Sequence, residues 1–419
     1  MTHVMRPPLR IILPIALAVG CAAIVLGIFA WQLALSTSML ERAGRETETT
    51  IPTPGATPPT LLAPVDPHSD ALLQLRRGDL AVLQGDWSMA QTAYAASVQA
   101  GGGIPAMRKL ALAQLQQRDF TGLRATMDAW RRAGGRSEDL LLVDGLLLLR
   151  TGKNEELTAL LDRAGDVPQA HYLRALRAIA SGDDAMAQQE IGAVNAGWEP
   201  VLRSYAKTLA AAYDEYALFP DSPRIHLQTL LARALAQVQE CELALPILQR
   251  VTTEQDDYRD AWIVRGYCEL TGSHATEAVA SLERAYALDP EKPAIQYFLG
   301  RAQAAVGNHE NALTYLQYAL RNGFEPESDV RRWIAQESLA MGNPLLALQQ
   351  FDVLTGLPDA TLETYAQYVS AAIAAGNVEE ARGKAAAASA KWPDDPAAKK
   401  LVDTANSANA PPMSAPAQP

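Results

Sequence analysis

Residues 261–290 read AWIVRGYCELTGSHATEAVASLERAYALDP and contain one complete unit of a pattern that recurs along the chain. A small residue recurs at intervals of 34, 34, 35 and 34 residues: Ala244, Ala278, Ala312, Ala347 and Ala381. A second series keeps the same intervals twelve residues earlier: Ala232, Gly266, Gly300, Ala335 and Val369. A third series follows the first by four residues: Leu248, Leu282, Leu316, Phe351 and Ala385. A fixed period of this length indicates tandem helical units.

The three series predict a pair of helices in each unit. Small residues allow the two helices of a hairpin to approach closely, and we expect the larger Leu and Phe residues to fill the gap to the next hairpin. Gly307, Gly342 and Gly376, with Gly272 one residue out of register, fall between the two helical stretches, where a tight turn favours a residue that tolerates positive φ. Stacked hairpins form one continuous core. The sequence therefore predicts an all-α fold, an α-solenoid of helical hairpins.

One unit also matches the signature of a known family. Trp262, Gly266, Ala278, Leu282, Ala285 and Pro290 have the spacing of the tetratricopeptide repeat, and so do Leu299, Gly300, Gly307, Ala312, Leu316 and Ala319 in the next unit. Arg265 and Glu269 depart from the pattern, since the family prefers a large apolar and an aromatic residue there. The chain resembles membrane-anchored bacterial tetratricopeptide proteins from residue 70 to about 400, most clearly after 224. This resemblance implies a scaffold that binds proteins or peptides on its concave face.

The N-terminal half repeats less regularly, and a long helix from Glu199 to Tyr216 is expected to end before Pro220 and Pro223 because proline interrupts helices. The predicted organisation is a cytoplasmic tail at 1–10, a transmembrane anchor at 11–35, a Pro/Thr-rich linker at 36–69, an N-terminal array at 70–196, a connecting helix and breaker at 197–223, a C-terminal array at 224–402 and a disordered tail at 403–419.

The segment from Ile11 to Leu35 is apolar except for Gln32, and its length matches the roughly 30 Å hydrocarbon core of a bilayer. It exceeds the roughly 7 to 15 apolar residues of a cleavable signal peptide. We therefore expect a single-pass signal anchor in the inner membrane, with the N-terminus in the cytoplasm and the repeats in the periplasm. The lipoprotein-like run from Ala18 to Cys21 is the weaker alternative, because the sequence remains apolar after it.

Small residues recur at three- and four-residue steps within the predicted anchor: Ala16, Gly20, Ala23, Gly27, Ala30 and Ala34. Such a stripe allows close packing against another membrane helix. Self-association through this segment is one interpretation, and the ordinary abundance of Ala and Gly in such helices is the other.

Composition excludes several classes of function. The net charge of −11 offers no basic surface for phosphates, so we expect no nucleic-acid partner. The sequence lacks phosphate-binding loops, nucleophile elbows and zinc-ligand spacings, which predicts no enzyme activity, no cofactor and no metal site. His274 and His309 occupy nearly equivalent turns but are better explained as exposed turn residues.

Cys241 and Cys268 lie on predicted adjacent antiparallel helices at comparable height. In an oxidising compartment such a pair forms a disulfide if the sulfurs can meet. The alternative is two buried thiols that act as small apolar residues.

The predicted first helices carry a candidate peptide groove. Its residues lie one position after and three positions before the second small-residue series: Thr229, Arg233, Ile263, Tyr267, Tyr297, Arg301, Arg332 and Gln336. Arginine pairs bidentately with carboxylate, and tyrosine adds flat contact area, so the set suits an acidic peptide. A solvated helix face would have a similar composition.

These features predict a membrane-tethered scaffold or adaptor in a bacterial envelope complex, such as one for secretion, outer-membrane or pilus assembly, or cytochrome maturation. A periplasmic chaperone beside a translocon, holding unfolded clients in the same groove, is the alternative. An enzyme with an unrecognised site ranks last.

Overall fold

The computed structural model describes residues 67–83, 86–219 and 221–408. These residues form twenty α-helices and one short 3-10 helix, with no strand among them, which confirms the all-α prediction. The first half comprises α2 (Pro67–Leu83), α3 (Trp87–Gln99), α4 (Gly103–Gln116), α5 (Phe120–Arg132), η1 (Ser137–Leu140), α6 (Leu141–Arg150), α7 (Asn154–Ala164), α8 (Pro168–Ser181), α9 (Asp184–Ala196) and α10 (Pro200–Ala217). The second half comprises α11 (Arg224–Gln237), α12 (Cys241–Glu254), α13 (Arg259–Thr271), α14 (Ala275–Leu288), α15 (Pro293–Ala305), α16 (His309–Arg321), α17 (Glu327–Ala340), α18 (Pro344–Thr355), α19 (Leu362–Ala374), α20 (Val378–Lys391) and α21 (Pro396–Ser407).

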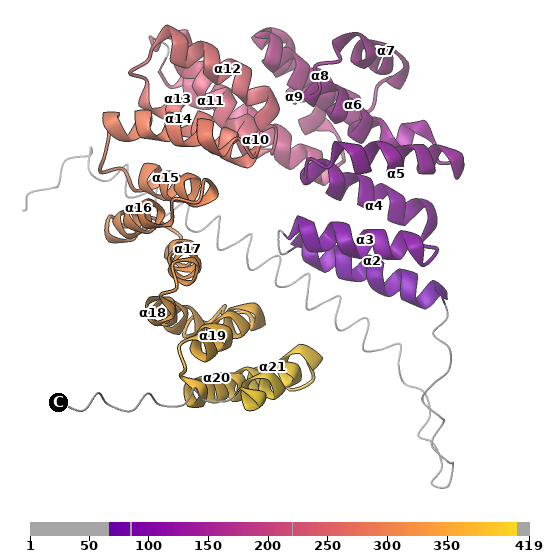
Figure 1. Cartoon of the computed structure of the whole chain (residues 1–419). Helices are drawn as coiled ribbons and strands as arrows, with labels where there is room; N and C mark the ends of the chain where they lie inside the picture. Colours follow the sequence, from indigo (N-terminus) through magenta and orange to yellow (C-terminus); the bar gives the residue numbers. More distant parts are fainter. Residues whose placement is uncertain (1–66, 84–85, 220, 409–419) are drawn as a thin grey trace, which may run out of the picture. The chain divides into compact units, whose positions relative to one another are not determined.

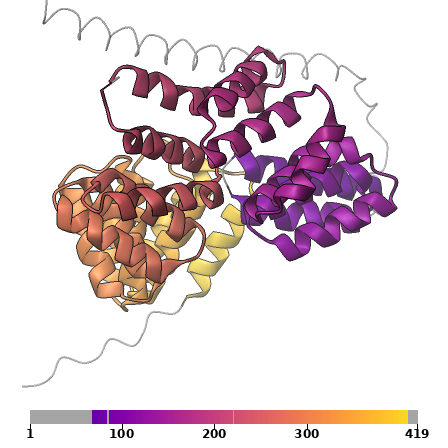
Figure 2. The same ribbon diagram turned by 90° about the horizontal axis from the view of Figure 1, so that it is seen from above.

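Successive helices pack side by side as antiparallel pairs, and each pair also contacts the next helix in the chain (Figures 1 and 2). Several helices begin at an aspartate whose carboxylate accepts a hydrogen bond from a backbone N–H three residues later, as Asp86, Asp119 and Asp183 do. Such caps satisfy backbone donors that have no partner within the helix. The predicted solenoid of tetratricopeptide-like hairpins is therefore the architecture observed.

The recurring small residues lie at the contacts between paired helices, as predicted. Every alanine of the first series is fully buried. A methyl group added at Gly266 of α13 would lie 2.4 Å from the Cγ atom of Leu282 in α14. Leu282 therefore packs within its own hairpin, and it also joins a cluster with Leu299 and Ala302 of α15. The expectation that these large residues contact the next hairpin is confirmed at Leu282, and Gly266 also leaves space for this side chain inside its own hairpin.

Turn geometry departs from the sequence expectation at one hairpin. Gly307, Gly342 and Gly376 have φ angles of 82°, 71° and 79°. In the preceding hairpin the residue in the same register is Ser273, with φ 64°, whereas Gly272 has φ −78° and caps α13. The prediction for Gly272 was wrong because the position in the turn, and not the residue type, determines which residue adopts the left-handed conformation.

The long helix expected between the two arrays is α10, which contacts both α9 and α11. A single hydrophobic cluster extends from Ala111 of α4 to Cys268 of α13 and includes residues of α10 such as Ala206 and Leu209. Within the described residues, α10 is therefore part of a continuous core.

A buried ion pair joins the two halves of this core. Arg150, the last residue of α6, contacts both carboxylate oxygens of Glu240 at 2.8 and 2.9 Å, and both side chains are almost wholly buried. The guanidinium also donates to the carbonyl oxygens of Leu115 and Gln239. The guanidinium thus links the end of α6 to Leu115 of α4 and to the residues just before α12, which are distant in sequence.

The ends of the described region differ slightly from the predicted boundaries. Helix α2 begins at Pro67, inside the predicted linker, and α21 continues to Ser407, inside the tail predicted to be disordered. The latter prediction was wrong for 403–407 because Leu401 and Ala405 are buried in the cluster that includes α20. The predicted anchor at 11–35 lies outside the described residues. None of the helices that the structure describes combines the length and apolarity needed to cross a membrane.

Candidate functional site

The predicted groove residues lie on four first helices, α11, α13, α15 and α17. Arg233, Arg332 and Gln336 are exposed, while Ile263, Tyr267 and Arg301 are partly buried. The remaining two, Thr229 and Tyr297, are buried. Thr229 donates its hydroxyl to the Ile225 carbonyl of its own helix at 2.9 Å and is buried, so it presents no exposed donor on this face.

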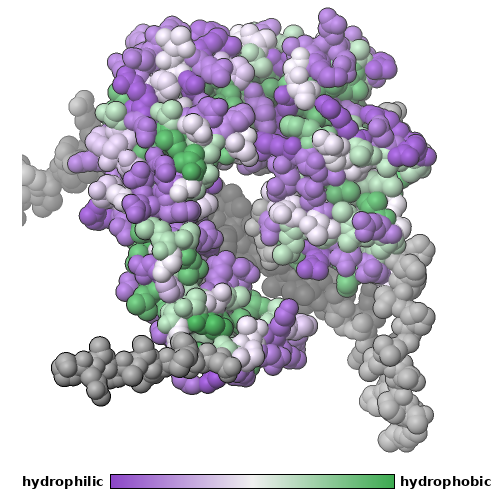
Figure 3. Space-filling view, in the orientation of Figure 1, coloured by the Kyte–Doolittle hydropathy of each residue, from purple (hydrophilic) through white to green (hydrophobic). Residues whose placement is uncertain are grey.

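Arg301 lies at the centre of an aromatic frame. Its guanidinium carbon is 5.5 Å from the Tyr297 ring centroid and 5.2 Å from that of Trp333, distances at which a cation is attracted to a ring face. Tyr297 stacks on Phe324 with centroids 4.2 Å apart, which fixes the first wall of the frame. Apolar residues are visible among polar ones on the surface of this part of the chain, from α15 to α19 (Figure 3).

The guanidinium of Arg301 forms no ion pair with any residue that the structure describes. Its Nε atom is buried without a hydrogen-bond partner. Burial raises the pKa of Tyr297, and the charge of Arg301 opposes this shift only in part. Arg301 is therefore a partly buried cation without a carboxylate partner among the described residues.

The other two arginines of the predicted groove already have partners. Arg233 pairs with Glu215 of α10, and Arg332 pairs with Asp329 of its own helix at 3.1 Å. Both pairs are about half exposed, so each is weak, but neither arginine is free. The structure thus reduces the predicted carboxylate-binding arginines to Arg301.

Sequence reasoning missed three members of the aromatic frame: Phe298, Phe324 and Trp333. Trp333 follows the predicted Arg332 by one residue, and its ring centroid lies 5.2 Å from the guanidinium carbon of Arg301. Phe298 contacts both Tyr267 and Tyr297 edge-on at 5.3 Å. A search for aromatics on both sides of each groove position would have found Phe298 and Trp333, whereas Phe324 lies in a loop outside the repeat register.

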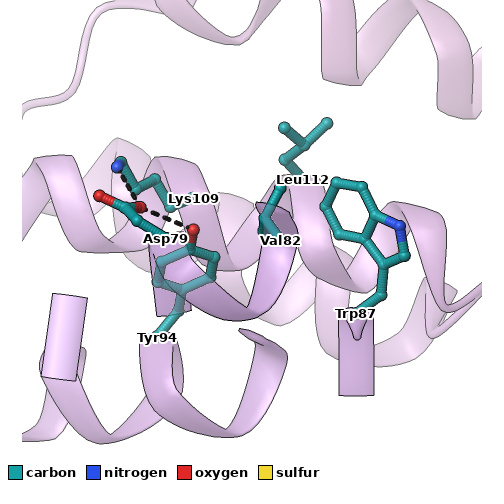
Figure 4. Close-up of a pocket in the computed structure, with 6 residues that line it drawn as sticks. All are labelled: Asp79, Val82, Trp87, Tyr94, Lys109 and Leu112. Carbon is teal, nitrogen blue, oxygen red and sulfur yellow. Dashed lines mark hydrogen bonds and ion pairs between the residues drawn. The ribbon is translucent and has the colours of Figure 1, made fainter. Parts of the chain in front are cut away.

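A second concave feature lies among the first three described helices (Figure 4). It has a volume of about 320 Å³ and apolar walls formed by Val82, Trp87 and Leu112. At its other end Asp79 accepts hydrogen bonds from Tyr94 and Lys109. Burial alone would raise the pKa of Asp79, but these two bonds and the charge of Lys109 outweigh it and lower the pKa. The ion pair is thus satisfied internally, so the pocket offers mainly apolar contact.

Cys241 and Cys268 are both buried, and both thiols are free. Burial, followed by the contact with Cys241, raises the pKa of the Cys268 thiol well above its ordinary value. The Cys268 sulfur is therefore not poised as a nucleophile. No group of three His, Cys, Asp or Glu residues suited to a metal ion occurs in the described ranges.

We predict that the two cysteines form a disulfide when the repeats reach an oxidising compartment. Oxidation joins the two sulfurs and transfers two electrons and two protons to a disulfide-exchange oxidant. Cells should be quenched with acid, denatured and alkylated before reduction, and the protein mass should show no alkyl group at Cys241 or Cys268. Two alkylated cysteines would reject the bond. Protein made in the reducing cytoplasm, which should take up both alkyl groups, serves as the control.

The described residues thus define a class of protein, an α-helical repeat protein in which first helices present the candidate binding residues. Residues 229–293 and 270–326 match the family model described as tetratricopeptide repeat. Residues 229–326 of the chain therefore contain tetratricopeptide repeats.

The chain is also similar to solved structures at low sequence identity. The crystal structure of TTC0263, a thermophilic TPR protein of Thermus thermophilus, is 17% identical, with 49% of this chain and 98% of that chain covered and a TM-score of 0.31. A crystal structure of MamA protein is 14% identical, with 43% of this chain and 92% of that chain covered and a TM-score of 0.36. A chain of the APC/C hetero-tetramer Cut9-Hcn1 is 13% identical, with 80% of this chain and 76% of that chain covered and a TM-score of 0.39. No curated protein sequence matches the chain.

Proposed function

We propose that this protein is a membrane-tethered scaffold that binds an acidic segment of a partner protein at Arg301. The observation that carries the proposal is a partly buried guanidinium without an ion pair among the described residues, framed by Tyr297 and Trp333. A carboxylate from a partner would supply the missing counter-charge. A charge-assisted hydrogen bond of this kind contributes about 1.5 to 3 kcal/mol.

The location we propose is the bacterial inner membrane, with the repeats in the periplasm and no catalytic role. The support comes from the apolar run of residues 11–35 and the Pro/Thr-rich stretch after it. Such a scaffold would hold partners within an envelope complex for secretion, outer-membrane or pilus assembly, or cytochrome maturation. The oxidation state of Cys241 and Cys268 in cells reports on the same compartment.

The test begins with a photo-crosslinking amino acid in place of Gln336, an exposed groove residue on α17. Crosslinking in native membranes, followed by mass spectrometry, should identify a few partners, each through a segment rich in Asp or Glu. Recovery of many unfolded proteins would instead indicate a chaperone. Crosslinks confined to neutral or basic segments would contradict carboxylate recognition.

Arg301→Glu should lower the crosslinking yield about tenfold or more, since it replaces an attraction of about 1.5 to 3 kcal/mol by repulsion. Arg321→Glu is the matched control, because Arg321 of α16 is an exposed arginine 4.8 Å from the ring of Tyr318 but lies on a second helix. An unchanged yield for Arg301→Glu, or an equal loss for both variants, would reject Arg301 as the anchor.

A further inference from the structure

The first described helix, α2, presents large apolar side chains to solvent. Leu72, Leu73 and Leu80 are 52%, 64% and 60% exposed. The opposite side of α2 packs on α3, where Gly78 lies against the ring of Tyr94 so closely that an added methyl group would be 2.3 Å from it. The exposed leucines therefore belong to the face that points away from the rest of the hairpin.

The repeat register shows what this face normally does. Gly78 precedes Tyr94 by sixteen residues, as Gly300 precedes Leu316, and both glycines contact these partners. In this register Leu73 corresponds to Ile295 of α15, and Leu80 corresponds to Ala302.

Both α15 residues are fully buried, and Ala302 shares a cluster with Leu282 of the preceding hairpin. The equivalent residues of α13, Ala261 and Cys268, are also fully buried. Leu73 and Leu80 thus occupy positions that later repeats bury, in part against the second helix of the preceding hairpin. No described residue supplies that helix for α2.

The C-terminal end of the array provides a comparison within the same chain. There α21 buries Ala398 and Leu401 while it exposes Lys399, Lys400 and Asp403. A helix with one apolar and one polar face is the usual termination of a helical repeat array, because it shields the last core surface from water. The outer face of α2 instead exposes Leu72, Leu73 and Leu80, which marks it as an interface.

Charge defines the helix that fits this interface. Arg76 and Arg77 are exposed between the leucines. Arg77 shares the register of Arg265 in α13, whose guanidinium donates to Thr252 of α12, the second helix of the preceding hairpin, at 3.0 Å. An arginine at this position therefore reaches the neighbouring helix. Two copies of α2 packed face to face would place the arginine pairs in one interface, which disfavours a second copy.

We propose that the outer face of α2 binds an amphipathic α-helix of a partner protein, which places apolar side chains on Leu73 and Leu80 and carboxylates beside Arg76 and Arg77. The partner helix takes the place of a second helix and extends the array by one element. This surface contains none of the residues around Arg301, so the inference is independent of the function proposed there.

The first test uses a stapled, fluorescein-labelled helical peptide with Leu at one face and Glu at its flanks. Fluorescence anisotropy with the full chain in detergent should show binding that the combined Leu73→Asp and Leu80→Asp changes weaken at least tenfold. The same peptide with Lys in place of Glu should bind at least tenfold more weakly. Leu345→Asp is the matched control, because Leu345 of α18 is likewise 60% exposed. Unchanged binding by the double variant, or equal binding of the Lys peptide, would overturn the proposal.

The second test places a photo-crosslinker at Leu73 in cells. A product mapped to an acidic amphipathic helix of another protein, and lost with Arg76→Glu and Arg77→Glu, would support the proposal. A product with this chain itself, from either the same or a second copy, would overturn the proposed occupant. The absence of any product would overturn the interface.

Discussion

Replacement of Glu240 by Gln is expected to lower the free energy of unfolding by about 3 kcal/mol or more, because it leaves the charge of Arg150 buried without its bidentate partner. The Arg150 side chain is 0% exposed and that of Glu240 is 2% exposed. Removal of one member of a buried pair costs more than the pair contributes, since the remaining charge cannot regain water. Glu242, 3.8 Å from Arg150, compensates only in part because Arg118 already pairs with it.

The measurement is the urea midpoint and slope of unfolding followed by circular dichroism. Glu156→Gln provides the control, since Glu156 pairs with Lys153 at 2.8 Å in a setting where both side chains are about half exposed or more. Its removal should change stability by less than about 1 kcal/mol. Equal midpoints for the two variants would show that the Arg150–Glu240 pair contributes no more than a surface pair.

The same variant should also loosen the contact between the two halves of the chain. Arg150 and Glu240 are 90 residues apart in sequence, and α6 and α8 both contact α12. Hydrogen exchange should therefore quicken in these three helices before it changes in α19 to α21, which form a separate cluster. This expectation follows from the nearest-neighbour stability of helical repeats.

Periodicity predicted the hairpins because the interhelical contact imposes the same constraint in each unit. Ala278 and Ala312 are both buried where the two helices of their hairpins meet, so they lie one repeat of 34 residues apart. The Arg150–Glu240 pair does not recur, because it joins the end of α6 to the start of α12, a contact that the other described hairpins do not make. Nothing in the local sequence relates its members, and the structure was needed to find it.

For the candidate site too, the sequence predicted the positions of the residues but not the partners of their side chains. The register placed Arg301 and Tyr297 on the correct helix, but it could not show that Arg233 already pairs with Glu215 of α10. It also treated Thr229 and Arg332 as equivalent, although one is buried and the other exposed. Partners from neighbouring helices, which differ from one unit to the next, determine whether a position can bind a ligand.

Gly266→Val is expected to destabilise the protein by about 2 to 3 kcal/mol through overpacking. A methyl group at this position would lie 2.4 Å from the Cγ atom of Leu282, which is fully buried and cannot move into solvent. Gly383→Val is the control, because Gly383 is also helical, in α20, and an added methyl group there would have no atom within 4 Å. Its effect should stay within about 0.5 kcal/mol. Urea denaturation of both variants gives the comparison.

The chain itself suggests how the damage can be repaired. At the corresponding positions of α19 and α20, a valine, Val369, occurs with Ala385, and both are buried in one cluster. A larger residue at the first position is therefore accompanied by a smaller residue at the second, so the two side chains fill one shared space. Leu282→Ala alone should cost about 2 to 5 kcal/mol by leaving a cavity. Combined with Gly266→Val, it should cost less than the sum of the single changes by about 0.5 to 3 kcal/mol. Additive losses would mean that these residues do not share one space, which would remove the physical basis of the 34-residue pattern in α13 and α14.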